Sequence, residues 1–196
     1  MSSSSKLIII TAPSGSGKST IVQHLLSNFP QLCFSISACT RKPRLGEHDG
    51  VNYYFISIED FTRKISQHEF AEFEMVYEGK YYGTLKSELE RIWNHQQTPL
   101  IDIDVQGALR LKKHYGQQAL TLFIQAPNLE ILEQRLRNRQ TETEESLQER
   151  LHKASDELTY ANQFDALVVN DDLQTACNET ILIITKFLEV NPSTPN

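Results

Sequence analysis

The sequence predicts an α/β protein with a parallel sheet core flanked by helices. Short apolar runs rich in branched residues alternate with stretches of helical period, a glycine-rich loop follows the first run, and an aromatic-rich segment interrupts the alternation. Apolar runs of this kind are typical of buried parallel strands, and their alternation with helices is typical of a doubly wound sheet. The predicted strands are 7–11, 100–104, 120–125 and 166–170.

Amphipathic helices are predicted between these strands. Leu85, Leu89 and Ile92 recur at helical spacing, with Trp93 beside them, and this predicts one apolar helix face. Another helix is predicted from near Thr143, because the acidic run that starts there suits the positive end of a helix dipole.

The chain of 196 residues predicts a single domain over 6–188 with two additions to its core. Aromatic-rich alternating runs predict a small mixed α/β lobe inserted after the first helix, and a highly charged stretch predicts a helical lid. Both ends of the chain read as flexible termini. The predicted parts are the core (6–34, 96–127 and 150–188), the inserted lobe (about 35–95), the lid (about 128–149) and the termini (1–5 and 189–196).

Composition excludes several classes of protein. With 39% hydrophobic and 22% charged residues the chain is neither disordered nor fibrous, and its net charge of -6 argues against a nucleic-acid binder. No run approaches the length of a membrane span, and no signal peptide is recognised. Cys33, Cys39 and Cys177 lack the spacing of a disulfide framework or a zinc site. We therefore expect a cytoplasmic protein.

The strongest motif is a phosphate-binding loop between the first predicted strand and a helix. Its residues are Ala12, Pro13, Ser14, Gly15, Ser16, Gly17, Lys18, Ser19 and Thr20. Backbone N–H groups of such a loop surround the phosphates of ATP or GTP, a lysine reaches the β and γ phosphates, and a serine hydroxyl ligates Mg²⁺. The order of strand, loop and helix therefore predicts a nucleoside triphosphate site.

One position of this loop departs from the usual pattern, since Ala12 stands where a glycine is expected. An alanine fits if it ends the strand with negative φ. The alternative, a helix N-terminus that happens to contain small residues, is less favoured, because Lys18 and Ser19 stand in the right context.

A second polar cluster lies in the predicted lobe. Arg41 and Arg44 flank a proline, and Tyr53 follows at the start of a predicted strand. Two guanidinium groups and a phenol suit a phosphate monoester, because arginine supplies rigid paired donors. A solvated charged loop is an equally good interpretation of composition alone.

This cluster and several other motifs resemble those of guanylate kinases. The resemblance runs from Leu7 to about Leu188. It rests on the phosphate loop and on six further motifs: CTR at 39–41 followed by Arg44, Glu47 and Gly50, then YYF at 53–55, KYYGT at 80–84, DIDVQGA at 102–108, RLRNRQTETEES at 135–146 and VVNDDL at 168–173. It implies the P-loop nucleotide-kinase fold, with the inserted lobe binding GMP. Cys39 replaces a threonine of the family pattern.

The resemblance also implies roles for single residues. It places the GMP phosphate against Arg41, Arg44, Tyr53 and Tyr82, and the guanine against Ser37, Glu72, Thr84 and Asp104. Guanine offers N1–H and a 2-amino group as donors and O6 as an acceptor, which suits a carboxylate together with a hydroxyl. On its own, Glu72 would be interpreted as an exposed strand residue.

Two further roles are implied near ATP. Asp102 and Ser19 are assigned to Mg²⁺, and Asn170 to the neighbourhood of the adenine. A strand-end aspartate is also often only a helix cap, and an asparagine after a strand is often only a turn former.

The lid would supply arginines that neutralise charge during transfer. The implied catalytic residues are Lys18, Arg41, Arg135, Arg139 and Arg150. Arg137 falls outside the family pattern and is expected at the surface. The alternative interpretation of this stretch is a salt-bridged helix, in which some of the arginines pair with neighbouring glutamates. Asn138 and Gln140 replace glycines that flank Arg139 in many relatives, which puts the rate of lid closure in question.

The implied activity is transfer of the γ-phosphoryl group of ATP, with Mg²⁺, to GMP and dGMP. The expected partners are these small molecules, with no nucleic acid and no membrane, and the chain would act as a monomer or homodimer. One alternative is a non-catalytic scaffold of the same fold that binds phosphopeptides. The other is a P-loop kinase for a different small phosphorylated substrate.

Overall fold

The computed structural model describes residues 5–77, 79–138 and 143–189. The strands are β1 (Leu7–Thr11), β2 (Leu32–Phe34), β3 (Ala38–Cys39), β4 (Tyr54–Phe55), β5 (Phe70–Tyr77), β6 (Lys80–Leu85), β7 (Thr98–Asp102), β8 (Ala119–Gln125) and β9 (Ala166–Val169). The α-helices are α1 (Lys18–Asn28), α2 (Ile58–Ser66), α3 (Lys86–Asn94), α4 (Val105–Tyr115), α5 (Leu129–Arg137), α6 (Glu144–Leu158) and α7 (Leu173–Glu189). Most of each predicted flexible terminus lies outside the described residues.

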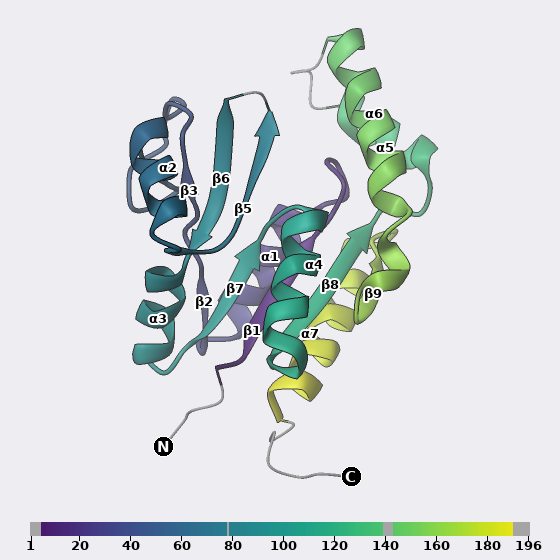
Figure 1. Cartoon of the computed structure of the whole chain (residues 1–196). Coiled ribbons are helices and arrows are strands. Elements are labelled where there is room, and N and C mark those ends of the chain that lie inside the picture. Colours follow the sequence, from purple (N-terminus) through teal and green to yellow (C-terminus); the bar gives the residue numbers. More distant parts are fainter. Residues whose placement is uncertain (1–4, 78, 139–142, 190–196) are drawn as a thin grey trace.

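The core is a parallel sheet of five strands in the order β2-β7-β1-β8-β9. Side chains of β1 alternate between its two faces. Ile8 and Ile10 pack in one apolar cluster with residues of α1 and α7, whereas Leu7 and Ile9 pack in another with residues of α3 and α4. Helices therefore cover both faces (Figure 1), and the predicted doubly wound fold is confirmed.

One strand boundary was predicted wrongly. The strand expected at 100–104 begins at Thr98 and ends at Asp102. Asp104 is instead the N-cap of α4, where its carboxylate accepts a hydrogen bond of 2.8 Å from the Gly107 N–H. A carboxylate that satisfies a free helix N–H takes its residue out of the strand, so β7 stops earlier.

The inserted segment folds into its own small sheet, in the order β4-β3-β6-β5. β3 pairs parallel to β4 and antiparallel to β6, and β5 and β6 form a hairpin, so the predicted mixed lobe is confirmed. Its apolar centre stacks Phe61 of α2 on Phe70, with ring centroids 4.3 Å apart. Leu89 of α3, which was predicted within the lobe, packs with the core cluster.

The lid consists of α5 and α6, which share an apolar cluster that includes Leu132, Leu136 and Leu147. The Thr143 hydroxyl accepts a hydrogen bond from the Ser146 N–H, so α6 begins where its acidic first turn predicted. The lid and the β5–β6 hairpin stand on opposite sides above the core sheet (Figure 1).

Candidate functional site

A cavity of about 420 Å³ lies at the carboxyl ends of β1 and β7 and is lined by the phosphate loop, the lobe and α6. Open α/β sheets bind their ligands at this edge. The predicted site residues that line it are Ala12, Pro13, Ser14, Gly15, Gly17, Lys18, Ser19, Ser37, Tyr53, Glu72, Tyr82, Asp102, Asp104 and Arg150. The other predicted residues that the structure describes lie beside this cavity or away from it: Ser16, Thr20, Arg41, Arg44, Thr84, Arg135 and Asn170.

The phosphate loop has the backbone that its glycines predict. Gly15 and Gly17 have φ of 95° and 89°, a region that other residues rarely adopt, and α1 starts immediately afterwards at Lys18. Ala12 is absent from the described non-glycine residues with positive φ, so it is accommodated as expected. The N-terminus of α1 thus opens onto the cavity, where it favours negative charge.

Lys18 forms an ion pair with Asp102 across the cavity wall. Asp102 ends β7, and Asp104 rather than Asp102 caps the following helix, so the helix-cap interpretation of Asp102 is wrong. The ammonium group is thereby held beside the loop that would receive the phosphates.

Asn170 stabilises the phosphate loop through a hydrogen bond to its backbone. Its side chain is buried, and its Nδ2 donates a 2.7 Å hydrogen bond to the Ser16 carbonyl oxygen. A Cβ on Gly17 would collide with this amide. Asn170 is therefore more than a turn former: it fixes the loop through a backbone carbonyl.

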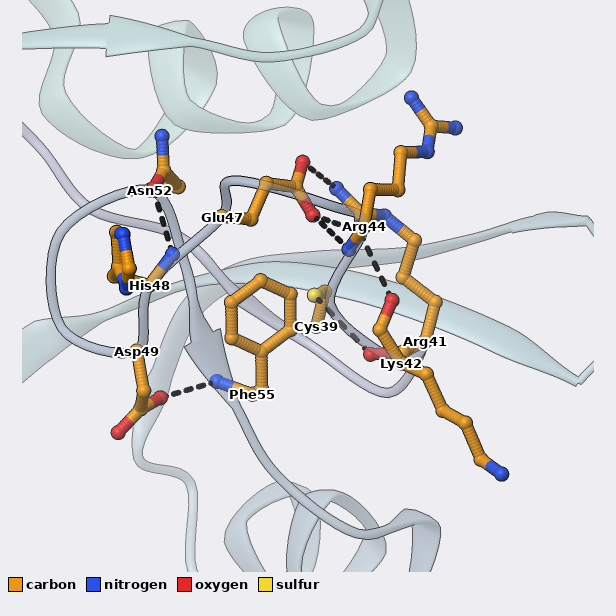
Figure 2. Close-up of polar contacts among 9 residues, drawn as sticks. All are labelled: Cys39, Arg41, Lys42, Arg44, Glu47, His48, Asp49, Asn52 and Phe55. Carbon is orange, nitrogen blue, oxygen red and sulfur yellow. Dashed lines mark hydrogen bonds and ion pairs between the residues drawn. The ribbon is translucent and has the colours of Figure 1, made fainter.

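In the lobe, Arg41 is held by Glu47 and by two aromatic rings. Glu47 accepts paired hydrogen bonds of 2.5 and 2.7 Å from Arg41, and the guanidinium lies 4.8 Å from the Tyr53 ring centroid and 5.5 Å from that of Phe55. Hydrogen bonds from Arg41 and from the Arg44 N–H lower the pKa of Glu47 to about 2. Figure 2 shows the Glu47 carboxylate bonded to both the Arg41 guanidinium and the Arg44 backbone nitrogen. The Arg41 side chain is only 10% exposed, so a solvated-loop interpretation does not hold for it.

Arg44 differs from Arg41, because its backbone rather than its guanidinium contacts Glu47. The Arg44 N–H donates a 2.7 Å hydrogen bond to Glu47, while its exposed side chain extends away from that carboxylate (Figure 2).

The two tyrosines assigned to the phosphate lie together. The ring centroids of Tyr53 and Tyr82 are 6.0 Å apart in an edge arrangement, and both line the cavity. Burial, and then the charge of Asp102, raises the pKa of Tyr53. Its hydroxyl therefore remains a donor at neutral pH.

Glu72 is a buried carboxylate, with only 5% of the residue exposed, so its interpretation as an exposed strand residue is wrong. Its Oε1 accepts hydrogen bonds of 3.0 Å from the Thr84 N–H and 2.7 Å from the Thr84 hydroxyl. Burial raises the pKa of Glu72 to about 7, and the nearby Asp104 charge adds to the rise. Glu72, Asp104 and Ser37 all line the cavity at its lobe side.

In the lid, Arg150 of α6 donates a 2.8 Å hydrogen bond to the Ser14 hydroxyl of the phosphate loop. Arg135 instead reaches the Asp171 carbonyl oxygen at 3.4 Å. Arg139 lies outside the described residues. Arg137 is exposed, as predicted, and it pairs with Glu133 and Glu144.

Four residues outside the predicted site also line the cavity: Gly83, Ile103, and the charged Lys153 and Glu157 of α6. Burial raises the pKa of the Glu157 carboxyl, against the effect of the Lys153 charge. Positions 150, 153 and 157 are three and four residues apart and share one helix face, which is the signal that would have found them.

A further residue that was not predicted, Glu88 of α3, supports the lobe. Its buried carboxylate accepts 3.0 Å hydrogen bonds from the Ile36 N–H and from the Tyr54 hydroxyl. Burial alone would raise its pKa, but hydrogen bonds from Arg91, Ile36 and Tyr54 leave that pKa lowered. Glu88 thus anchors the backbone next to Ser37.

Comparison with known proteins agrees with this geometry. The model of the guanylate kinase family matches residues 4–186. A guanylate kinase of Bacteroides thetaiotaomicron is 48% identical over 183 residues, which cover 93% of this chain and 90% of the relative. A guanylate kinase of Porphyromonas gingivalis is 48% identical over 184 residues, covering 93% and 98%.

A solved structure is also similar. The crystal structure of guanylate kinase from Anaplasma phagocytophilum has a TM-score of 0.74 and 25% identity, with 95% of this chain and 87% of that chain covered. Both sequence and architecture therefore place the protein in one family: the chain belongs to the guanylate kinases.

Proposed function

We propose that the protein transfers the γ-phosphoryl group of ATP to GMP or dGMP and releases ADP and GDP or dGDP. The observation that carries this proposal is a single cavity with a phosphate loop at one side and a buried carboxylate, Glu72, at the other. The names of the relatives support the same activity.

On the donor side, the phosphate loop would hold the triphosphate of ATP. Lys18 would leave its ion pair with Asp102 and pair with the β and γ phosphates. Asn170 would maintain the loop conformation through its hydrogen bond to Ser16. Asn170 acts in this proposal through the backbone of the loop, and its proximity to adenine stays a prediction.

Ser19 and Asp102 would hold Mg²⁺, because these two oxygen donors line the cavity beside the loop. This ion commonly takes one or two protein ligands and completes its shell with water and phosphate oxygens. When bound, it would neutralise charge on the β and γ phosphates.

On the acceptor side, the phosphate of GMP would be bound by Arg41, Tyr53 and Tyr82. The exposed Arg44 side chain would turn toward this phosphate when GMP binds. Ionised Glu72 would accept from N1–H and the 2-amino group of guanine, with Asp104 beside it. Thr84 donates its hydroxyl to Glu72, so we assign it to orienting that carboxylate, and Ser37 to O6 of guanine.

During transfer the protein would align the two substrates and neutralise charge on the moving phosphoryl group, with no covalent intermediate. Arg150 donates a hydrogen bond to Ser14 of the loop, which places it better than the other described lid arginines, Arg135 and Arg137. Arg135 and Arg139 would join it when the lid closes over the substrates.

Two rival functions are less favoured. A phosphopeptide-binding scaffold would not need the ion pair of Lys18 and Asp102 beside an intact phosphate loop. A kinase for a phosphorylated sugar would not need a buried carboxylate held by Thr84.

The test is an assay that couples ADP release to a colour change, with GMP, dGMP, AMP, UMP and CMP offered in parallel. The proposal predicts turnover with GMP and dGMP and little with the other three. Equal rates for all five, or ADP release only with a different acceptor, would contradict it.

We further propose that the protein acts in the cytoplasm on these small molecules, as a monomer or homodimer. Its three cysteines are free, which suits a reducing compartment. Within the described ranges, none of the helices has the length and apolarity to cross a membrane.

A further inference from the structure

Gly107 lies directly against the carboxylate that would select guanine. It is the third residue of α4, and a Cβ placed on it would lie 2.8 Å from Glu72 Oε2 and 3.3 Å from Glu72 Cδ. Real Cβ atoms essentially never approach an oxygen so closely, so any side chain here would force an atom to move.

The backbone of α4 does not itself require glycine. Gly107 is not among the glycines with positive φ, and it lies in the first turn of a helix, where alanine is favoured over glycine. Its N–H donates to the Asp104 carboxylate, but any residue other than proline could make that bond. The remaining reason for glycine is the space that Glu72 occupies.

Glu72 has little freedom to move aside for a new methyl group. Two hydrogen bonds from Thr84 hold its Oε1, and only 5% of the residue is exposed, at the cavity that it lines. The backbone fixes the position of the new methyl group, which would also lie 3.3 Å from Ile103 Cδ1. The new methyl group would therefore push on the Glu72 carboxylate, tilt it about its hydrogen bonds to Thr84, and turn Oε2 away from its present direction.

We propose that Gly107 is a specificity-determining residue, which permits the Glu72 carboxylate to take the orientation that pairs with N1–H and the 2-amino group of guanine. The inference rests on the proposed function. Gly107 is a positioning residue: it does not line the cavity, and it acts through Glu72 on one side and through its N–H to Asp104 on the other.

The test compares Gly107→Ala with the wild-type protein on GMP and on inosine monophosphate, which lacks only the 2-amino group. A misdirected buried hydrogen bond should lower kcat/KM for GMP by about 10-fold to 100-fold, mainly through KM. The kcat/KM for inosine monophosphate should fall less, so the ratio of kcat/KM for GMP to that for inosine monophosphate should fall by about tenfold. The KM for ATP should stay the same, because the phosphate loop is untouched.

A matched control and a double variant separate positioning from a general effect on folding. Gln106→Ala changes the exposed neighbour in the same turn and should leave both substrates unaffected. In a Glu72→Asp background the shorter side chain leaves room for the methyl, so adding Gly107→Ala should cause little further loss.

Three outcomes would overturn the inference: an unchanged preference in Gly107→Ala, equal losses for both acceptors, or fully additive losses in the double variant. A thermal melt of each variant identifies a folding defect, which would lower all rates together. Failure of the wild-type protein to phosphorylate GMP would instead refute the proposed function, and that control is run first.

Discussion

In the proposed function the choice of base depends on Glu72, a buried carboxylate that lines the cavity while Thr84 donates to its Oε1. Glu72→Gln replaces an acceptor with an amide that presents a donor toward guanine. We expect kcat/KM for GMP to fall by about 100-fold or more and the preference over AMP to narrow. Steady-state kinetics with both nucleotides measure this ratio, and an unchanged ratio would remove Glu72 from base recognition.

The raised pKa of Glu72 predicts a pH dependence of GMP binding. Guanine donors pair with the ionised carboxylate, and the pKa of about 7 means that the free protein is largely protonated at lower pH. The affinity for GMP should therefore be full above pH 7 and fall by up to about tenfold per pH unit below it. Calorimetric titrations from pH 5.5 to 8.5 measure this.

Glu72→Gln is the control for that profile, because the phosphate of GMP titrates equally in both proteins. The wild-type slope should exceed that of the variant below pH 7, and identical slopes would contradict the assignment. The same raised pKa makes the folded protein hold a proton that the unfolded chain has lost between about pH 4.5 and 7. This contribution to folding stability should therefore decline across that window as pH rises, and it should be absent from Glu72→Gln.

Lys18 tests the donor side of the cavity. Lys18→Ala removes the cation that now pairs with Asp102 and would neutralise the transferred phosphoryl group. Turnover should fall by at least about 100-fold while GMP binding stays largely intact. Lys86→Ala, which changes an exposed lysine at the start of α3, should keep wild-type kinetics. Wild-type turnover by Lys18→Ala would contradict a catalytic phosphate loop.

At the scale of residues, the sequence predicted positions better than contacts. Lys18 and Asp102 were each named, but their ion pair depends on β1 and β7 being neighbours, which no local pattern states. Glu72 was assigned only through the family resemblance, since its burial comes from α4 and Thr84, both distant from it in sequence.

The phosphate loop as an element depends on a residue from the end of the last strand. Asn170 follows β9 and holds the Ser16 carbonyl, so its loss leaves a buried acceptor without that bond. Asn170→Ala should cost about 1–3 kcal/mol of stability, a melting point lower by several degrees, and weaken ATP binding.

Asn178→Ala is the matched control for that experiment, because this asparagine is exposed on α7 and should change stability by less than about 0.5 kcal/mol. Thermal melts with and without ATP make the comparison. Equal melting points for the two variants would show that the hydrogen bond from Asn170 to Ser16 does not contribute to stability.

Elements with strong periodicity were predicted well, and short ones were not. The three-residue β2 and the two-residue β3 and β4 exist because neighbouring strands pair with them, so their own residues carry little signal. The end of β7 was misplaced because Asp104 satisfies α4 instead of continuing the strand.

For the whole molecule, one cavity is lined by residues of the core, the lobe and the lid, so each proposed substrate would contact more than one part. ATP analogues that cannot be hydrolysed and GMP should each raise the melting temperature. A ligand at about 100 times its Kd adds about 2.7 kcal/mol of stability, and both together should add at least the sum. Differential scanning calorimetry with each ligand and with the pair measures this. A smaller shift for the pair would mean that the ligands compete for one site.

The fold class followed from the sequence because alternating strands and helices allow few arrangements. The strand order and the burial of Glu88 between α3 and the lobe are properties of the assembled molecule. The lining residues Lys153 and Glu157 were missed because helix α6 continues past the predicted lid to Leu158.

The most direct measurement follows the phosphorus atoms themselves by ³¹P NMR, in a mixture of the protein, Mg²⁺, ATP and GMP. Direct transfer between two sites in one cavity predicts that ADP and GDP appear in equal amounts, with no inorganic phosphate and no reaction when GMP is left out. Release of inorganic phosphate with GMP unchanged, or transfer to AMP as fast as to GMP, would contradict the account.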